Sequence, residues 1–316
     1  MAGICPVAIG TSMAVRDEVQ HLPAAVFALI GAMAIQIGTN YCNDYCDFFQ
    51  GADTDDRKGP TRTVQAGLVT PQAMLLATIL AFTIAAFASG YLTIRAGWPI
   101  AVLAVFSVLF GVFYTAGRYS LAYLGIADPF VLFFFGPIAV AGTYYVQAME
   151  VSLESVVAGI APGAIATGLL VVNNLRDIDE DRLANKRTLA VRFGKTFSRL
   201  EYTICILSAG VIPFLLWSVF GFSPMVCIAS LVLIPSLVLL RKVWVVEGVG
   251  LNPYLGKTRR STIAIANQRR TRLNTPATRR PSFQGMDSGL LPRRPILFAA
   301  RLARESQPTM RCKPWD

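Results

Sequence analysis

Long uncharged hydrophobic stretches alternate along the chain with short charged segments. A helix needs about 20 residues to cross a bilayer, and stretches of roughly that length cover residues 22–43, 71–94, 96–117, 129–149 and 155–175. A longer stretch, residues 202–240, predicts two spans that break near residues 221–224, because Gly and Pro interrupt helices. The opening stretch, residues 1–15, is short for a crossing and predicts the tail of a first helix. The pattern predicts an all-α, multi-spanning transmembrane helical bundle with eight visible spans.

The composition agrees with a membrane protein. Hydrophobic residues make up 54% of the 316 residues, and charged residues make up 15%. Soluble domains carry about 25% charged residues. The composition therefore argues against a soluble globular protein.

The distribution of basic residues predicts which loops face the cytoplasm. Residues 1–257 contain 16 Lys and Arg and 16 Asp and Glu, while residues 258–316 contain 13 and 3. Within residues 1–257, 14 basic residues follow the second, fourth, sixth and eighth spans, and Arg16 and Arg95 lie in the other loops. Cytoplasmic loops carry an excess of Lys and Arg. We therefore expect a multi-pass protein of the cell membrane whose loops after even-numbered spans are cytoplasmic.

Two polar motifs stand at the ends of predicted spans on that cytoplasmic side. In the first, Asn40, Asp44 and Asp47 are spaced i, i+4 and i+7 and share one helix face. In the second, Asn173, Asp177 and Asp181 are spaced i, i+4 and i+8. The two helix ends therefore repeat one arrangement of an amide followed by two carboxylates.

Clustered carboxylates predict a cation site. Oxygen ligands without His or Cys favour Mg²⁺ or Ca²⁺, and Mg²⁺ usually combines one or two carboxylates with phosphate oxygens. Two facing acidic motifs therefore suggest a bound diphosphate bridged by metal ions, with basic neighbours balancing its remaining charge. These neighbours are Arg57, Lys58, Lys186 and Arg187. The alternative interpretation is that the charges form ordinary solvated ion pairs at the membrane edge.

The motifs resemble those of the UbiA superfamily of intramembrane aromatic prenyltransferases, which carry an NDxxDxxxxxD-type first motif and a DxxxD second motif. The resemblance covers nearly all of residues 1–257. Within the superfamily the chain is most similar to the 1,4-dihydroxy-2-naphthoate polyprenyltransferases of menaquinone synthesis. The similar strings include Asn43-Asp44-Tyr45, Gly51-Ala-Asp53, Arg57-Lys-Gly59-Pro60-Thr-Arg62, Phe134-Phe-Gly136, Gly142-Thr-Tyr144-Tyr145, Asn173-Asn-Leu-Arg-Asp177 and Lys186-Arg-Thr.

The resemblance implies a bundle of nine transmembrane helices around a central cavity. Mg²⁺ and a polyprenyl diphosphate would bind at the cytoplasmic end, and the prenyl tail would extend between helices toward lipid. The implied reaction transfers the polyprenyl group to 1,4-dihydroxy-2-naphthoate with loss of CO₂ and gives demethylmenaquinone. We expect the lipid bilayer and the two substrates as partners, and neither a nucleic acid nor an obligate protein partner.

The residues expected to act in this reaction come from both motifs and from three tyrosines. We predict that Mg²⁺ is bound by carboxylates, namely Asp44, Asp47, Asp177 and Asp181, with Asp53 as a further candidate. We predict that the substrates are bound by Asn40, Asn43, Arg57, Lys58, Arg62, Asn173, Asn174, Lys186 and Arg187. The rings of Tyr114, Tyr144 and Tyr145 would face the allylic cation or orient the acceptor. Alternatively, these tyrosines belong to the interfacial aromatic belt.

The C-terminal part of the chain departs from the family pattern. After Gly256-Lys257-Thr258 the family continues into an apolar ninth helix, whereas residues 258–316 are rich in Arg and Pro without a stretch of span length. We therefore divide the chain into a transmembrane prenyltransferase domain, residues 1–257, and a basic tail, residues 258–316. The tail is interpreted as the product of a frameshift or as a disordered segment that binds anionic lipid or nucleic acid.

Other functions remain open at this point. The acceptor of a UbiA-type enzyme could instead be 4-hydroxybenzoate, homogentisate or a haem, and the donor could carry a phytyl chain. A divalent cation transporter would also use paired acidic motifs, but transport sites usually lie near the membrane midplane. Here the acidic residues gather at one membrane face beside basic residues that suit a phosphate.

Overall fold

A computed structural model describes residues 3–50, 62–117 and 120–253, which contain helices and no strand. All of these residues belong to the first of two compact units, residues 1–274. The predicted all-α class is confirmed. Among the predicted site residues, Asp53, Arg57 and Lys58 lie outside the described residues, as does the tail.

Six helical segments of the described chain are long and apolar enough to cross a membrane. They are α2 (Leu22–Gln50), α3 (Pro71–Ala96), α6 with α7 (Ala127–Phe134 and Pro137–Ala148), α8 (Leu153–Arg176), α10 (Leu189–Ser218) and η1 with α11 (Pro224–Val232 and Leu233–Val245). Two shorter apolar helices, α1 (Ile4–Arg16) and α4 (Trp98–Phe113), cover the other predicted spans. The total of eight spans stays a prediction, because α1 and α4 are shorter than a crossing needs.

The break predicted near residues 221–224 is confirmed. Helix α10 ends at Ser218, and the next helical segment begins at Pro224. Gly221 between them has a φ of 66°, a left-handed conformation that favours glycine. The chain reverses direction there, so that α11 contacts α10.

The predicted span over residues 129–149 agrees with a candidate membrane span over Ala127–Ala148, in which the helix is interrupted at Phe135 and Gly136. Gly136 has φ −118° and ψ −112°, which is not helical. A Cβ atom on Gly136 would lie 2.4 Å from the carbonyl oxygen of Leu132 and 2.7 Å from that of Gly159. Only glycine fits this close approach, and Pro137 starts the next helix.

Helix α8 is the central element of the bundle. It contacts α6, α7 and α10, and 72% of its most apolar window is buried, whereas the other five long segments are buried to 44% or less. Its inward surface is made of small residues, which allow close helix contacts in a membrane. They include Ala158, Gly159, Ala161, Gly163 and Ala164.

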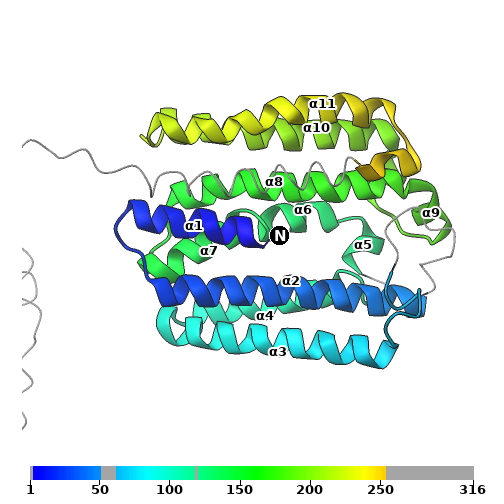
Figure 1. The fold of residues 1–316 in the computed structure, drawn as a ribbon, viewed down its shortest axis with the longest axis horizontal. Coiled ribbons are helices and arrows are strands. Elements are labelled where there is room, and N and C mark those ends of the chain that lie inside the picture. The colour runs from blue at the N-terminus through cyan, green and yellow to red at the C-terminus, as the bar shows by residue number, and fades with distance from the viewer. Residues whose placement is uncertain (1–2, 51–61, 118–119, 254–316) are drawn as a thin grey trace, which may run out of the picture. The chain divides into compact units, whose positions relative to one another are not determined.

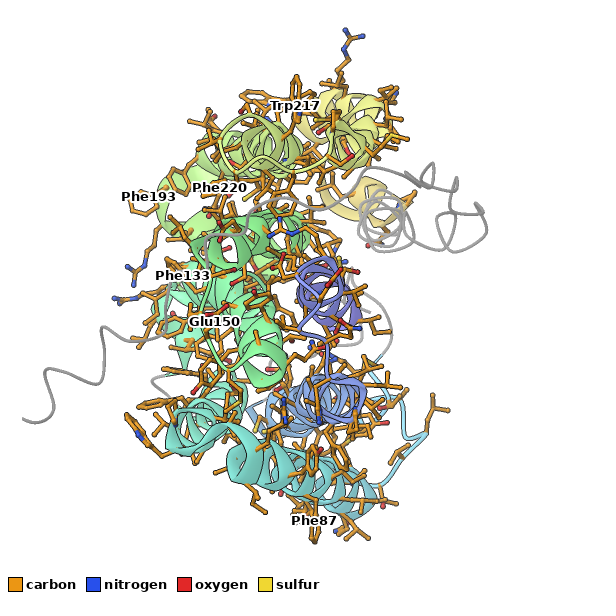
Figure 2. The ribbon with its side chains drawn as sticks, turned by 90° about the vertical axis from the view of Figure 1, so that its left-hand side faces the viewer. Phe87, Phe133, Glu150, Phe193, Trp217 and Phe220 are labelled. Atoms are coloured by element: carbon orange, nitrogen blue, oxygen red, sulfur yellow. The ribbon has the colours of Figure 1, made fainter. Side chains whose placement is uncertain are left out.

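Large apolar side chains point outward from the peripheral helices. Phe87 of α3 is 77% exposed and Trp217 of α10 is 45% exposed, at opposite edges of the bundle (Figure 2). A surface of this kind suits contact with lipid rather than water. The fold is therefore that of a membrane-embedded helical protein.

The chain order brings the ends of distant helices together. In Figure 1 the last turns of α2 lie at the same end of the bundle as the short helices α5 (Leu121–Leu124) and α9 (Ile178–Leu183). Thr188 caps the start of α10 at this end, where its hydroxyl oxygen accepts a hydrogen bond from the Val191 amide at 3.3 Å. Both predicted motifs belong to this end.

Candidate active site

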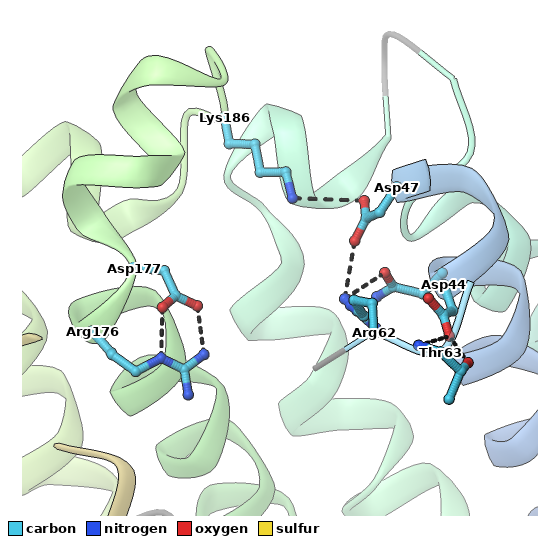
Figure 3. Close-up of polar contacts among 8 residues, drawn as sticks. Asp44, Asp47, Arg62, Thr63, Arg176, Asp177 and Lys186 are labelled. Atoms are coloured by element: carbon cyan, nitrogen blue, oxygen red, sulfur yellow. Dashed lines mark hydrogen bonds and ion pairs between the residues drawn. The ribbon is translucent and has the colours of Figure 1, made fainter. Parts of the chain in front are cut away.

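The first motif lies on the last turns of α2, and the chain folds back onto it. Asp44 and Asp47 are 7% and 2% exposed. Arg62 donates hydrogen bonds of 3.0 Å from Nη2 to Asn43 Oδ1 and to Asp47 Oδ2 (Figure 3). The Thr63 amide donates to Asp44 Oδ2 at 3.2 Å, and the Thr63 hydroxyl bonds to the same oxygen. Residues 62–63 therefore fix the orientation of both carboxylates.

The second motif lies at the junction of α8 and α9. Arg176, which is 2% exposed, donates from Nε and Nη2 to the two oxygens of Asp177, each at 2.6 Å. Arg176 Nη1 also donates to Asn252 Oδ1 at 3.0 Å. Such a bidentate pair fixes the carboxylate plane. Burial raises the pKa of Asp181 to about 7, and the positive charge of Lys186 opposes this increase.

Lys186 connects the two motifs. Its Nζ lies 3.6 Å from Asp47 Oδ1 and 5.5 Å from the centre of the Tyr123 ring. The segment that follows is held against α5, because the Arg187 amide donates to the Tyr123 carbonyl at 3.1 Å and Arg192 Nη2 donates to the Leu124 carbonyl at 2.6 Å. The ends of α2, α5 and α9 thereby form one polar site.

The oxygen atoms of this site fit a hard divalent cation that also binds another molecule. Asp44 Oδ1 and Asp47 Oδ1 are buried and make no hydrogen bond within the described residues. Those residues hold no group of three or more His, Cys, Asp or Glu side chains close enough to enclose a metal by themselves. Mg²⁺ commonly binds through one or two carboxylates and completes its shell with phosphate oxygens and water. The donor set therefore fits Mg²⁺ bound together with a diphosphate.

An apolar cavity of about 220 Å³ lies inside the bundle. Its lining includes Thr39 and Tyr114 near the motifs and Ile100 and Val146 toward the other end of the helices. Aromatic rings of α4 and α6 form part of the wall. Tyr114 lines the cavity and interacts electrostatically with Asp47 and with Asp181. Such a cavity can hold a hydrocarbon chain whose polar head is at the motifs.

Two of the predicted tyrosines are at the other end of the bundle. The Tyr144 hydroxyl donates to Asp17 Oδ2 at 3.0 Å, and the Tyr145 hydroxyl donates to the Ala96 carbonyl at 2.9 Å. Both bonds lie among the helix ends at the opposite end of the bundle from the two motifs. The order of spans indicates this position, because the span over residues 129–149 begins on the predicted cytoplasmic side. Tyr114 is the predicted tyrosine that the structure brings to the motifs.

The remaining predicted residues surround the site at different depths. Asn173 and Asn174 are half-buried on the last turns of α8, whereas Asn40 and Arg187 are exposed. Sequence reasoning missed Thr63 and Arg176 as partners of the motif carboxylates. Arg176 carried a signal, since a basic residue directly before Asp177 at a membrane edge is expected to pair with it.

Comparison with known proteins gives the family. The model of the UbiA prenyltransferase family matches residues 4–248, and the chain belongs to this family. It is 40% identical over 224 residues to 1,4-dihydroxy-2-naphthoate octaprenyltransferase of Mycobacterium tuberculosis, covering 69% of this chain and 76% of the relative. The Escherichia coli protein of the same name is 34% identical over 219 residues, covering 67% and 71%.

Solved structures show the same fold at low sequence identity. A UbiA homologue from Aeropyrum pernix has a TM-score of 0.64 at 13% identity and covers 86% of this chain and 98% of its own. A UbiA homologue from Archaeoglobus fulgidus, bound to GPP and Mg²⁺, has a TM-score of 0.60 at 14% identity and covers 84% and 93%. The helical arrangement is therefore that of the UbiA membrane prenyltransferases.

Proposed function

We propose that this chain transfers a polyprenyl group from its diphosphate to 1,4-dihydroxy-2-naphthoate, with loss of CO₂ and release of diphosphate, to give demethylmenaquinol, the hydroquinone form of demethylmenaquinone. The main support is the joining of two carboxylate motifs by Lys186 at one end of an apolar cavity. The relatives at 34–40% identity that are named for this acceptor support the choice of the naphthoate. The chain would act in the cell membrane with the motifs facing the cytoplasm, as the basic loops predict.

The polar site would bind the diphosphate head of the donor. Asp44, Asp47, Asp177 and Asp181 would hold Mg²⁺, which when bound neutralises the charge of the leaving diphosphate. Lys186 adds positive charge directly beside Asp47. The remaining phosphate oxygens would be bound by four basic residues, namely Arg57, Lys58, Arg62 and Arg187. Fixed positive charge at this position favours departure of the diphosphate as the allylic carbon–oxygen bond breaks.

The cavity would hold the reacting carbon and the chain behind it. Tyr114 lines the cavity and interacts electrostatically with Asp47 and Asp181, which supports a position of its ring near the reacting carbon. An aromatic face stabilises the positive charge that develops on the allylic carbon. The apolar wall excludes water, which would otherwise capture this cation in place of the electron-rich ring of the acceptor.

The test is a product assay with the full chain in membranes. Membranes that contain the chain are given 1,4-dihydroxy-2-naphthoate and a polyprenyl diphosphate, with Mg²⁺ or with a chelator, and the prenylated product is measured. We expect product with Mg²⁺, loss of product with the chelator, and loss in both Asp44→Ala and Asp177→Ala. Glu154→Gln, a carboxylate at the other end of α8, is the matched control and should keep full activity. Product that survives chelation and both substitutions would contradict the proposal.

A further inference from the structure

Asp128 is a buried carboxylate that the reaction as proposed so far does not use. It lies in the first turn of α6 and is 2% exposed. Neither of its oxygens makes a hydrogen bond within the described residues. A carboxylate buried without a partner is costly, and inside a membrane such residues commonly serve a ligand.

Asp128 belongs to a helix that forms part of the cavity wall. Val131 stands one turn later on the same side of α6 and lines the cavity. Tyr114, which also lines the cavity, interacts electrostatically with Asp128 as well as with Asp47 and Asp181. Asp128 is not itself a lining residue, but it lies near Tyr114, which is one, and near Glu201 of α10.

We propose, on the basis of the prenyl transfer proposed above, that Asp128 binds the aromatic acceptor by accepting a hydrogen bond from a ring hydroxyl. A hydroxyl that donates to a carboxylate forms a short, charge-assisted bond. This bond also increases the electron density of the ring, which makes the ring a better nucleophile toward the allylic carbon. Asp128 thus binds the aromatic acceptor and does not bind the diphosphate of the prenyl donor.

The chemistry of the acceptor selects one of its two hydroxyls. In 1,4-dihydroxy-2-naphthoate the hydroxyl next to the carboxylate bonds internally to that carboxylate. The hydroxyl across the ring is free, and it is also the one farther from the acceptor's negative charge. Two carboxylates in a site of low dielectric repel each other. Asp128 therefore bonds to the hydroxyl across the ring and orients the acceptor with its carboxylate pointing away.

The first test separates the two substrates kinetically. The full chain and its Asp128→Asn variant are purified in detergent, and KM is measured for the acceptor and for the polyprenyl diphosphate. We expect the substitution to raise the acceptor KM about tenfold or more, as for loss of a hydrogen bond to a charged group. The KM of the diphosphate and the thermal midpoint should stay unchanged. Glu154→Gln is again the matched carboxylate-to-amide control and should change neither KM.

The second test uses an acceptor analogue as an inhibitor. A naphthoate whose free hydroxyl is replaced by a methyl ether cannot donate the proposed bond. The wild-type chain should bind the acceptor at least about tenfold more tightly than this ether, and Asp128→Asn, whose amide oxygen accepts only a weaker neutral bond, should show a smaller preference. An equal preference in both proteins overturns the proposal.

The remaining outcomes are also decisive. An unchanged acceptor KM in Asp128→Asn, or an equal rise of both KM values, overturns the acceptor role. A lowered thermal midpoint with a proportional loss of active protein assigns Asp128 a structural role instead. If the wild-type chain makes no product from the naphthoate, the proposed function fails and this inference fails with it. An active wild type with an unaffected variant contradicts the Asp128 inference alone.

Discussion

The contact between α8 and the α6–α7 break leaves no room for a side chain at Gly163. A Cβ atom there would lie 2.2 Å from the carbonyl oxygen of Leu132 and 2.9 Å from the Cα of Gly136, where ordinary contact begins at 3.4 Å. Both neighbours are backbone atoms, so no side-chain rotation relieves the overlap. Gly163→Ala must therefore separate the helices.

The matched control is Gly90→Ala in α3. A Cβ atom at Gly90 meets nothing within 4 Å. Each substitution gains about 1 kcal/mol of helix propensity, and this gain cancels when the two variants are compared. The difference between them is then the overpacking term, typically about 1–3 kcal/mol. We expect Gly90→Ala to be slightly more stable than wild type, and Gly163→Ala to fall below Gly90→Ala by that amount.

The free energy of unfolding is measured by SDS titration of the purified chain in mixed micelles. The same preparations are assayed for acceptor KM, because α6 carries Asp128 and the cavity wall. Gly163→Ala should lose stability and also show an altered acceptor KM. Equal stability of the two variants would show that α8 does not contact the α6–α7 break as described, and would refute the reasoning.

Three further predictions concern the charged site and its distant tyrosine. Lys186→Gln should raise the KM of the polyprenyl diphosphate about tenfold or more. The control Lys195→Gln removes an exposed ion pair and should leave this KM unchanged. Equal effects of the two substitutions would contradict binding of the diphosphate by Lys186. Tyr144→Phe should cost about 1 kcal/mol of stability without a change in kcat, and a large drop in kcat at unchanged stability would instead place Tyr144 in the reaction. Asp47→Asn should abolish turnover. The same variant should bind metal-free pyrophosphate more tightly, as measured by calorimetry, because Arg62 and Lys186 lose their ion pairs with Asp47 and can bind phosphate oxygens. Weaker binding of pyrophosphate would contradict a phosphate-binding role of these two residues.

The helix pattern and the local motif geometry could be predicted because both depend on neighbours in the chain. A spacing of three or four residues puts Asp44 and Asp47 on one face of any helix that contains them. Hydrophobic length likewise predicts where helices run. These features need no knowledge of how the helices are arranged.

Contacts between distant helices could not be predicted in the same way. The break at Gly136 depends on the approach of Gly159 and Leu132, which no local pattern encodes. The isolation of Asp128 is likewise a property of the surrounding helices. In the sequence it is a single acidic residue before a hydrophobic stretch, typical of the first turn of a helix.

Under the proposed function, one set of charged residues would serve both the ligand-free and the substrate-bound protein. Without a ligand, the buried charge of Asp47 is balanced by Arg62 and Lys186, and a carboxylate without such partners would be strongly destabilising. If a diphosphate binds here with Mg²⁺ as proposed, Asp47 would hold the cation, and Arg62 and Lys186 would bind phosphate oxygens. The charge of Asp47 would then keep a partner in both states. This exchange requires Lys and Arg within reach of the same carboxylate, which is the arrangement that the structure shows.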